Sequence, residues 1–243
     1  MSTILTFTRP DQLDQIMPGM TLGQAEFEHI MKMLGLMWTY DGEPCEEKSH
    51  AQLASPMHSN GFFDVGSLMK GYPEVRWNLA QQLVDRFSAN QAGPIHGVIG
   101  APTSSTDLAG DVAEILRVRH FILDKIEGGI VWREDQENIL GYECLLRVEE
   151  LMTTASSCEK AMEAVLAGNP GWGGTYYPIV YTIVDRSDPA AGPLSVRGST
   201  VDSLFRYEVR NFDPAVCPYC AVGSPALKPK ENREIFFPNA VAA

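Results

Sequence analysis

The chain has 243 residues, of which 44% are hydrophobic and 21% charged, enough for one sizeable α/β domain or two small ones. Its net charge of -12 opposes the binding of nucleic acid or an anionic membrane, so we exclude both as main partners. No segment is apolar for long enough to span a bilayer, no signal peptide is visible, and five unevenly spaced cysteines favour a reducing cytoplasm.

The N-terminal third predicts helices separated by a loop. Residues 21–37 have helical periodicity, and Thr21 and Gln24 have the spacing of a capping box. Residues 41–60 are typical of a loop. A second helix is expected at 73–88, where Pro73 suits the first turn and one apolar stripe holds Val75, Leu79, Leu83 and Phe87.

Strands and helices then alternate. We expect strands at 96–101, 120–124, 144–150 and 175–185, a hairpin around 125–134, a turn at 101–106, and helices at 107–116 and 155–167. This alternation predicts a central, mostly parallel sheet of about five strands, flanked by helices. We divide the chain into an N-terminal helical hood segment (1–52), an α/β core (53–200) and a C-terminal tail (201–243).

The segment EELMTTASS, residues 149–157, follows a predicted strand and opens a helix. Ligands of parallel α/β sheets bind at the carboxyl ends of strands, and a helix N-terminus favours phosphate. Glu149 and Glu150 can accept hydrogen bonds from sugar hydroxyls. The segment is therefore consistent with a sugar-phosphate site, although Ser and Thr also cap helices and paired acids are often simply solvated.

The same segment resembles the motif V-[ED]-D-x-x-T-T-G-G-S of the type I phosphoribosyltransferases. Four further segments, in the same order along the chain, resemble the orotate branch of that family: SPMHSNGFFDVG (55–66), VIGAPTSSTDLAGDVAEIL (98–116), IVYTIVDRS (179–187) and CPYCAVGSPALKP (217–229). The resemblance spans about residues 53–229. It implies a type I phosphoribosyltransferase fold with a small hood formed by the N- and C-terminal segments.

The resemblance implies transfer of phosphoribose from phosphoribosyl pyrophosphate (PRPP) to a pyrimidine-like base, with orotate the best candidate, in pyrimidine biosynthesis. It also implies Mg²⁺ as cofactor and a homodimer. By this carry-over Glu149, Glu150 and Lys125 are the catalytic residues. PRPP is bound by Thr153, Thr154, Ala155, Ser156 and Ser157, and on the pyrophosphate side by Ala101, Pro102, Thr103, Ser104 and Ser105. The base is contacted by Phe62, Phe63 and Arg186.

The sequence departs from the family pattern at several positions. Glu150 replaces the usual Asp, and Ala155 and Ser156 replace two glycines. No lysine occurs in the pyrophosphate segment 103–105, and the expected mobile loop, KIEGGIVWRE, supplies only Lys125 and Arg133. A divergent enzyme and a weakened relative that binds PRPP or a nucleotide as a sensor are therefore alternative functions. Convergence of the remaining cations on the segment 149–157 would favour the enzyme.

Cys217 and Cys220 form a C-x-x-C pair near the C-terminus. A redox dithiol normally follows the first strand and opens a helix, which this position does not match. A zinc site needs four ligands, and Cys45, His50 or His58 could supply the rest. The spacing matches no known finger, so the sequence favours packing of a C-terminal turn, and we assign no metal ligand from it.

Overall fold

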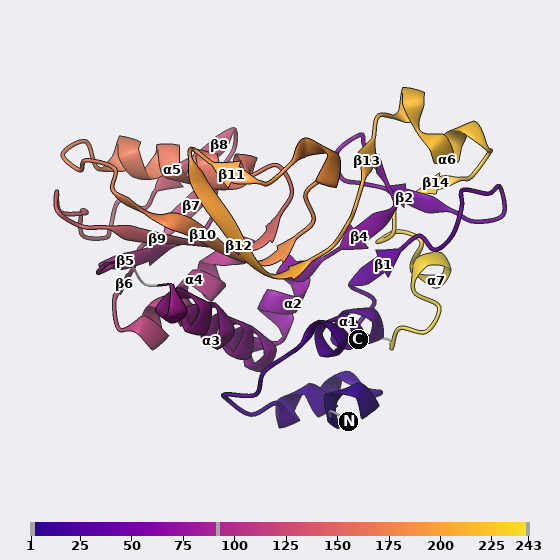
Figure 1. Ribbon diagram of the computed structural model, residues 1–243, viewed down its shortest axis with the longest axis horizontal. Helices are drawn as coiled ribbons and strands as arrows, with labels where there is room; N and C mark the ends of the chain where they lie inside the picture. The colour runs from indigo at the N-terminus through magenta and orange to yellow at the C-terminus, as the bar shows by residue number, and fades with distance from the viewer. Residues whose placement is uncertain (1–2, 91–92, 242–243) are drawn as a thin grey trace.

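A six-stranded sheet forms the centre of the computed structural model, which describes residues 3–90 and 93–241 (Figure 1). Its strand order is β11-β12-β10-β9-β5-β6; β11 is antiparallel to its neighbour and the others are parallel. The expected mostly parallel α/β sheet is confirmed. The strands are β5 (Gly97–Ile99), β6 (Arg119–His120), β9 (Leu145–Met152), β10 (Tyr176–Asp185), β11 (Ser195–Val196) and β12 (Ser199–Arg206).

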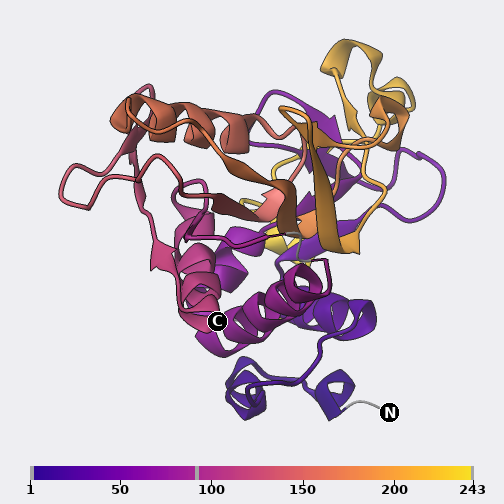
Figure 2. The same ribbon diagram turned by 60° about the vertical axis from the view of Figure 1, so that its left-hand side comes forward.

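Helices cover both faces of this sheet (Figures 1 and 2). One face packs against α2 (Val65–Gly71), α3 (Pro73–Ala89) and α4 (Ser104–Leu116), and the predicted apolar stripe of α3 is buried there. The other face packs against α5 (Ser156–Gly168) and the hairpin of β7 (Leu123–Ile126) and β8 (Gly129–Trp132). None of the helices in the described ranges could cross a membrane.

The N- and C-terminal segments form a hood beside the core. Strands from the two ends pair in a four-stranded sheet of order β13-β3-β2-β14, and β1 pairs with β4. The described elements here are η1 (Thr3–Thr6), η2 (Pro10–Gln15), α1 (Gln24–Met33), β1 (Met37–Thr39), β2 (His50–Gln52), β3 (His58–Ser59), β4 (Gly61–Phe63), β13 (Asn211–Phe212), η4 (Pro214–Val216), α6 (Pro218–Ala221), β14 (Ala226–Leu227) and α7 (Arg233–Phe236). The remaining short element, η3 (Pro189–Ala191), lies between β10 and β11.

Several expected element boundaries are wrong. The first helix ends at Met33 rather than 37, and it begins after Gly23 without a side-chain cap, so there is no capping box. Residue 37, the expected last residue of the helix, instead begins β1, because β4 offers this segment a partner. Helix α4 begins at Ser104, so its first turn includes residues expected in a turn.

Strand pairing over long sequence distances explains the other differences. The expected loop 41–60 contains β2 and β3, whose outer partners β14 and β13 lie more than 150 residues away. The expected strand 120–124 is divided between β6, in the central sheet, and β7, in the hairpin. Strand β12 extends to Arg206 inside the central sheet, across the expected boundary at residue 200.

Candidate active site

Three loops meet at the carboxyl edge of the central sheet. Strands β5, β9 and β10 are parallel neighbours, so the residues that follow each of them emerge side by side. These loops contain residues 100–103, residues 153–155 and Arg186. The backbone N–H of Arg186 donates to the carbonyl of Met152 over 3.0 Å, which joins two of the loops directly. The sheet therefore brings three sequence segments together that are far apart in the chain.

A pocket lies between the end of β9 and the start of α5. It is lined by Glu149 and by residues 151–158, a range that includes all five residues expected to bind the 5′-phosphate. The first hydrogen bond of the helix ladder runs from the N–H of Glu159 to the carbonyl of Ala155 over 3.0 Å. The N–H groups of residues 156–158 therefore precede the ladder, and the positive end of the helix dipole faces this pocket.

The turn before α5 is held by an unusual backbone conformation. Ala155 has a φ of 62°, in the left-handed region that glycine adopts at low cost. Its side chain is buried with Cys158 and Met162. Ala155 therefore occupies a position whose geometry suits the glycine of the family motif, and packing of its methyl group offsets part of the backbone cost.

Glu149 and Glu150 share one hydroxyl group. The Ser105 hydroxyl lies 2.7 Å from Glu149 Oε2 and also contacts Glu150 Oε2, while the backbone N–H of Ala101 donates to Glu149 Oε1 over 3.2 Å. The backbone N–H of Glu150 donates to the Ser105 hydroxyl over 3.1 Å. The loop after β5 and the acids of β9 are thus one hydrogen-bonded unit.

Burial changes the protonation of both acids. Glu149 is 4% exposed, and its burial, followed by the charge of Glu150, raises its pKa to about 8. Burial also raises the pKa of the half-buried Glu150. Burial therefore favours the neutral form of these acids, and a neutral carboxyl can both donate to and accept from a sugar hydroxyl.

The pyrophosphate segment, residues 101–105, lies at the start of α4. The peptide bond between Pro102 and Thr103 is cis, Ala101 and Ser105 are buried, and Thr103 is exposed. A Cβ on Gly100 would lie 2.5 Å from the carbonyl oxygen of Ser105, so only glycine fits the strand end here.

Lys70 is a candidate residue that the sequence analysis missed. Its ammonium group, on α2, donates to the Thr103 hydroxyl over 3.3 Å. It therefore supplies a cation beside the pyrophosphate segment, which has no lysine of its own. Its place in the chain, near the end of a seven-residue helix, gives no local signal of this contact.

Arg186 lies between the core and the hood. One of its Nη atoms donates to the carbonyl of Gly61 over 3.5 Å, and its Nε is buried without a hydrogen-bond partner. Burial lowers its pKa to about 10. Within residues 3–90 and 93–241 no carboxylate forms an ion pair with Arg186, so this guanidinium has capacity for an anionic ligand.

The two phenylalanines of the expected base site lie in different environments. Phe63 is 5% exposed and packs against Tyr207 with ring centroids 4.8 Å apart. Phe62 is half-buried and packs against Phe237 at 6.0 Å. Their contact with a base remains a prediction, while the carbonyl of Gly61 beside them meets Arg186.

The other cations do not converge on the pocket. Arg133 forms a bidentate pair with Asp124 at 3.1 and 2.6 Å, and Lys125 is exposed on the hairpin strand β7. Arg147 is 1% exposed and donates to the Tyr177 carbonyl and the Ser199 hydroxyl, each over 2.6 Å. The catalytic role expected for Lys125 therefore stays a prediction.

Comparison with known proteins identifies the family. The orotate phosphoribosyltransferase of Pelotomaculum thermopropionicum is 32% identical over 184 residues, which cover 76% of this chain and 90% of the relative. The chain belongs to the type I phosphoribosyltransferase family. The orotate phosphoribosyltransferase of Desulforamulus reducens is also 32% identical, over 180 residues, with 74% and 87% covered.

No model in a scan of protein families matches this phosphoribosyltransferase. The crystal structure of the orotate phosphoribosyltransferase from Aeropyrum pernix aligns with 73% of this chain and 92% of its own, at 18% identity and a TM-score of 0.49. The assignment to the family rests on the sequence relatives.

Proposed function

We propose that this phosphoribosyltransferase transfers phosphoribose from PRPP to a pyrimidine-like base, with orotate as the acceptor, and releases pyrophosphate. The observation that carries the proposal is the pocket lined by Glu149 and residues 151–158, at the carboxyl end of β9 and the N-terminus of α5. The groups that line it suit a ribose 5-phosphate unit, because carboxyl groups accept from ribose hydroxyls and free helix N–H groups bind phosphate.

The acceptor follows from Arg186. Orotate carries a carboxylate, and a half-buried guanidinium without an acidic partner among the described residues binds such a group well. The relatives from Pelotomaculum thermopropionicum and Desulforamulus reducens bear the name orotate phosphoribosyltransferase. Both points support orotate over a neutral base.

The reacting carbon of the ribose gains oxocarbenium character as pyrophosphate leaves. Glu149 and Glu150 would hold the ribose hydroxyls, and the negative charge that this pair carries when ionised would lie near that carbon. Lys70 and the Thr103 hydroxyl would hold the departing pyrophosphate. Thr153, Thr154, Ser156 and Ser157 would fix the 5′-phosphate, so that the ribose cannot move away from the base.

The donor set fits Mg²⁺. This ion binds through one or two carboxylates together with substrate phosphates; Glu149 lines the pocket, and Glu150 is joined to it through the Ser105 hydroxyl. When bound, Mg²⁺ neutralises charge on the pyrophosphate. The chain's own residues contribute the acids that hold it and the hydroxyls that orient the ribose.

Calorimetric titration with PRPP and Mg²⁺ tests the binding part of this proposal. We expect saturable binding of PRPP that is lost in a Thr154→Val/Ser157→Ala double variant. Lys160→Ala, an exposed change on the same helix, should bind like the wild type. Equal binding by the double variant would contradict the assignment of the pocket.

A binding protein without turnover is the second candidate function. The engagement of Arg133 by Asp124 and of Arg147 by Tyr177 and Ser199 favours it, because these cations are not available to a leaving pyrophosphate in this conformation. Binding of PRPP without release of pyrophosphate would favour this alternative.

A further inference from the structure

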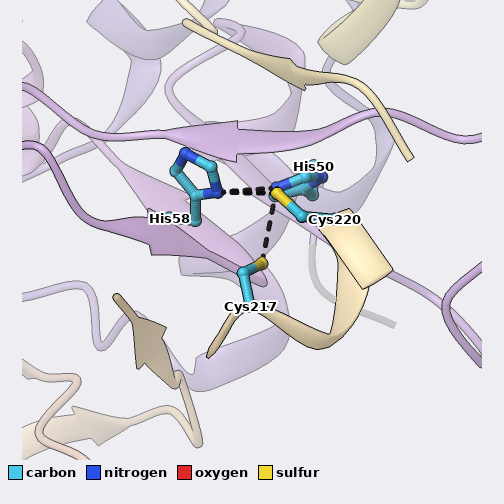
Figure 3. Close-up of side chains that lie close together, drawn as sticks. All are labelled: His50, His58, Cys217 and Cys220. Carbon is cyan, nitrogen blue, oxygen red and sulfur yellow. Dashed lines mark hydrogen bonds between the residues drawn. The ribbon is translucent and has the colours of Figure 1, made fainter. Parts of the chain in front are cut away.

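Four metal-binding side chains converge in the hood, away from the PRPP pocket. His50 begins β2, His58 begins β3, Cys217 precedes α6 and Cys220 lies within it (Figure 3). One ligand atom from each of the four lies within 4.8 Å of all the others. Two histidines and two cysteines from sequence segments more than 150 residues apart therefore point at one another.

The distances between the ligand atoms lie near those of a tetrahedral centre: all are within 4.8 Å, and four of them are between 3.1 and 3.6 Å. The two imidazoles approach to 3.1 Å, from His50 Nε2 to His58 Nδ1. The sulfurs of Cys217 and Cys220 each lie 3.6 Å from His50 Nε2. The Cys220 sulfur also lies 3.3 Å from His58 Nδ1. Zinc bonds of about 2.0–2.3 Å in a tetrahedron hold the ligand atoms about 3.3–3.8 Å apart.

Hydrogen bonding alone does not explain this cluster. The Ser224 hydroxyl donates to the carbonyl of Lys48 over 2.5 Å, so it accepts from His50 Nδ1, which lies 2.9 Å away. This leaves His50 Nε2 as a single lone pair facing His58 Nδ1 and both sulfurs. A cation at the centre satisfies all four groups, and Ser224 fixes the histidine tautomer as an outer partner does in metal sites.

We propose that His50, His58, Cys217 and Cys220 bind one zinc ion. A mixed set of two nitrogens and two sulfurs in a tetrahedron selects zinc among common metals. Two thiolates balance its charge, which suits a site where His50, His58 and Cys217 are 0%, 7% and 3% exposed. All four positions are filled by protein, as in structural zinc sites, so the ion holds the fold and leaves no position for a substrate.

The role of the ion follows from what it joins. It fixes the C-terminal turn around α6 to the β2–β3 hairpin, next to the pairing of β13 with β3. Strand β3 leads within two residues to Gly61, whose carbonyl meets Arg186. Zinc therefore stabilises the side of the hood that carries the segment expected to contact the base. The proposal does not depend on the reaction at the PRPP pocket.

Metal analysis of the full chain tests this site. Protein produced with added zinc should contain one zinc ion per chain, and Co²⁺ exchanged into it should give the visible absorption and sulfur-to-cobalt band of a tetrahedral thiolate site. Cys220→Ser should lose the metal, while Cys45→Ser should keep it, because Cys45 contacts Tyr40 and lies outside the cluster. Zinc-free wild type, or full zinc content in Cys220→Ser, would overturn the proposal.

Two measurements cover the case in which Cys220→Ser does not fold. In the wild type, zinc should protect Cys217 and Cys220 from an alkylating reagent, and a chelator should expose both, as mass spectrometry of the peptides will show. Ser224→Ala, which removes only the outer hydrogen bond, should lower zinc affinity about 10–100-fold. A disulfide between Cys217 and Cys220 in freshly purified protein, or alkylation that zinc does not change, would contradict the site.

Discussion

Glu149 is an acid whose burial favours its neutral form, and this has a cost for the unliganded protein. Below the pKa that Glu149 has in the unfolded chain, the residue is protonated in both the folded and the unfolded state, so it does not lower the free energy of unfolding. As pH rises towards the folded value of about 8, the unfolded chain releases the proton while the folded chain retains it. Its contribution to stability is therefore lost between about pH 4.5 and pH 8.

Glu149→Gln should remove this pH dependence. The variant keeps the shape of the side chain, and at pH 8 we expect its free energy of unfolding to exceed that of the wild type by about 1–3 kcal/mol, with little gain at pH 5. PRPP affinity should fall in the same variant. Urea unfolding at the two pH values measures the effect, and Glu127→Gln, on the exposed hairpin turn, is the control. A pH slope unchanged by Glu149→Gln would contradict the buried-acid account.

Arg186 should select for a base that carries a carboxylate. Because a charge-assisted hydrogen bond contributes about 1.5–3 kcal/mol, Arg186→Met should raise the KM for orotate about 10–100-fold and leave PRPP affinity nearly unchanged. Steady-state kinetics with each substrate varied in turn separates the two effects. Arg206→Met, a more exposed arginine at the end of the neighbouring strand β12, is the control. Equal losses in both variants would argue against a base contact.

Lys70 supplies the cation that the pyrophosphate segment lacks. If its ammonium group stabilises the leaving group, Lys70→Ala should lower kcat/KM about 100–1,000-fold, the effect of removing one charge-stabilising donor. Lys70→Arg should restore part of the rate. Lys160→Ala, exposed on α5, should have no effect. Wild-type kinetics in Lys70→Ala would contradict a contact between Lys70 and the leaving pyrophosphate.

At the scale of elements, the contact of α5 with the β7–β8 hairpin requires a glycine. A Cβ on Gly168, the last residue of α5, would lie 2.3 Å from Cβ of Trp132. Gly168→Ala should therefore push the hairpin away and lower the free energy of unfolding by about 1–3 kcal/mol. Gly171→Ala, where a Cβ meets no atom within 4 Å, should change it by less than about 0.5 kcal/mol. Thermal unfolding of both variants distinguishes the clash with Trp132 from the effect that any replacement of glycine by alanine has on the backbone.

Elements with strong internal patterns were predictable from the sequence. Strands β9 and β10 and helices α3 and α5 lie close to their expected positions, because each buries a continuous apolar run or stripe. Strands β2, β3, β13 and β14 are two or three residues long, and they exist because distant partners pair with them. Periodicity within a short window contains no information about such partners.

The candidate site divides in the same way. The segment 153–157 and both acids could be predicted as a candidate site from local sequence, since a strand end followed by a helix start is a local feature, and the pocket is lined by this segment and Glu149. The contact of Lys70 with Thr103 and the meeting of His50 and His58 with Cys217 and Cys220 depend on tertiary structure. The sequence named Cys45, His50 and His58 as possible further ligands, but the spacing alone could not choose among them, so it favoured simple packing for the cysteine pair.

At the scale of the whole molecule, the fold separates the proposed substrate pocket, at the central sheet, from the proposed zinc site, in the hood. The central sheet brings the loops of the proposed PRPP pocket together at its carboxyl edge, and the hood joins both ends of the chain beside it (Figure 1). Arg186 connects the two through the carbonyl of Gly61. We further propose a homodimer, as the family resemblance implies. Sedimentation of the full chain should give twice the monomer mass.

Release of pyrophosphate from PRPP and Mg²⁺, with orotate as acceptor, tests the proposed reaction most directly. We predict release that depends on orotate and equals the amount of orotidine 5′-monophosphate formed, with uracil much less effective because it lacks the carboxylate for Arg186. Binding of PRPP without release, under conditions where calorimetry shows the pocket to be filled, would contradict the enzyme and leave a PRPP-binding protein built on this fold.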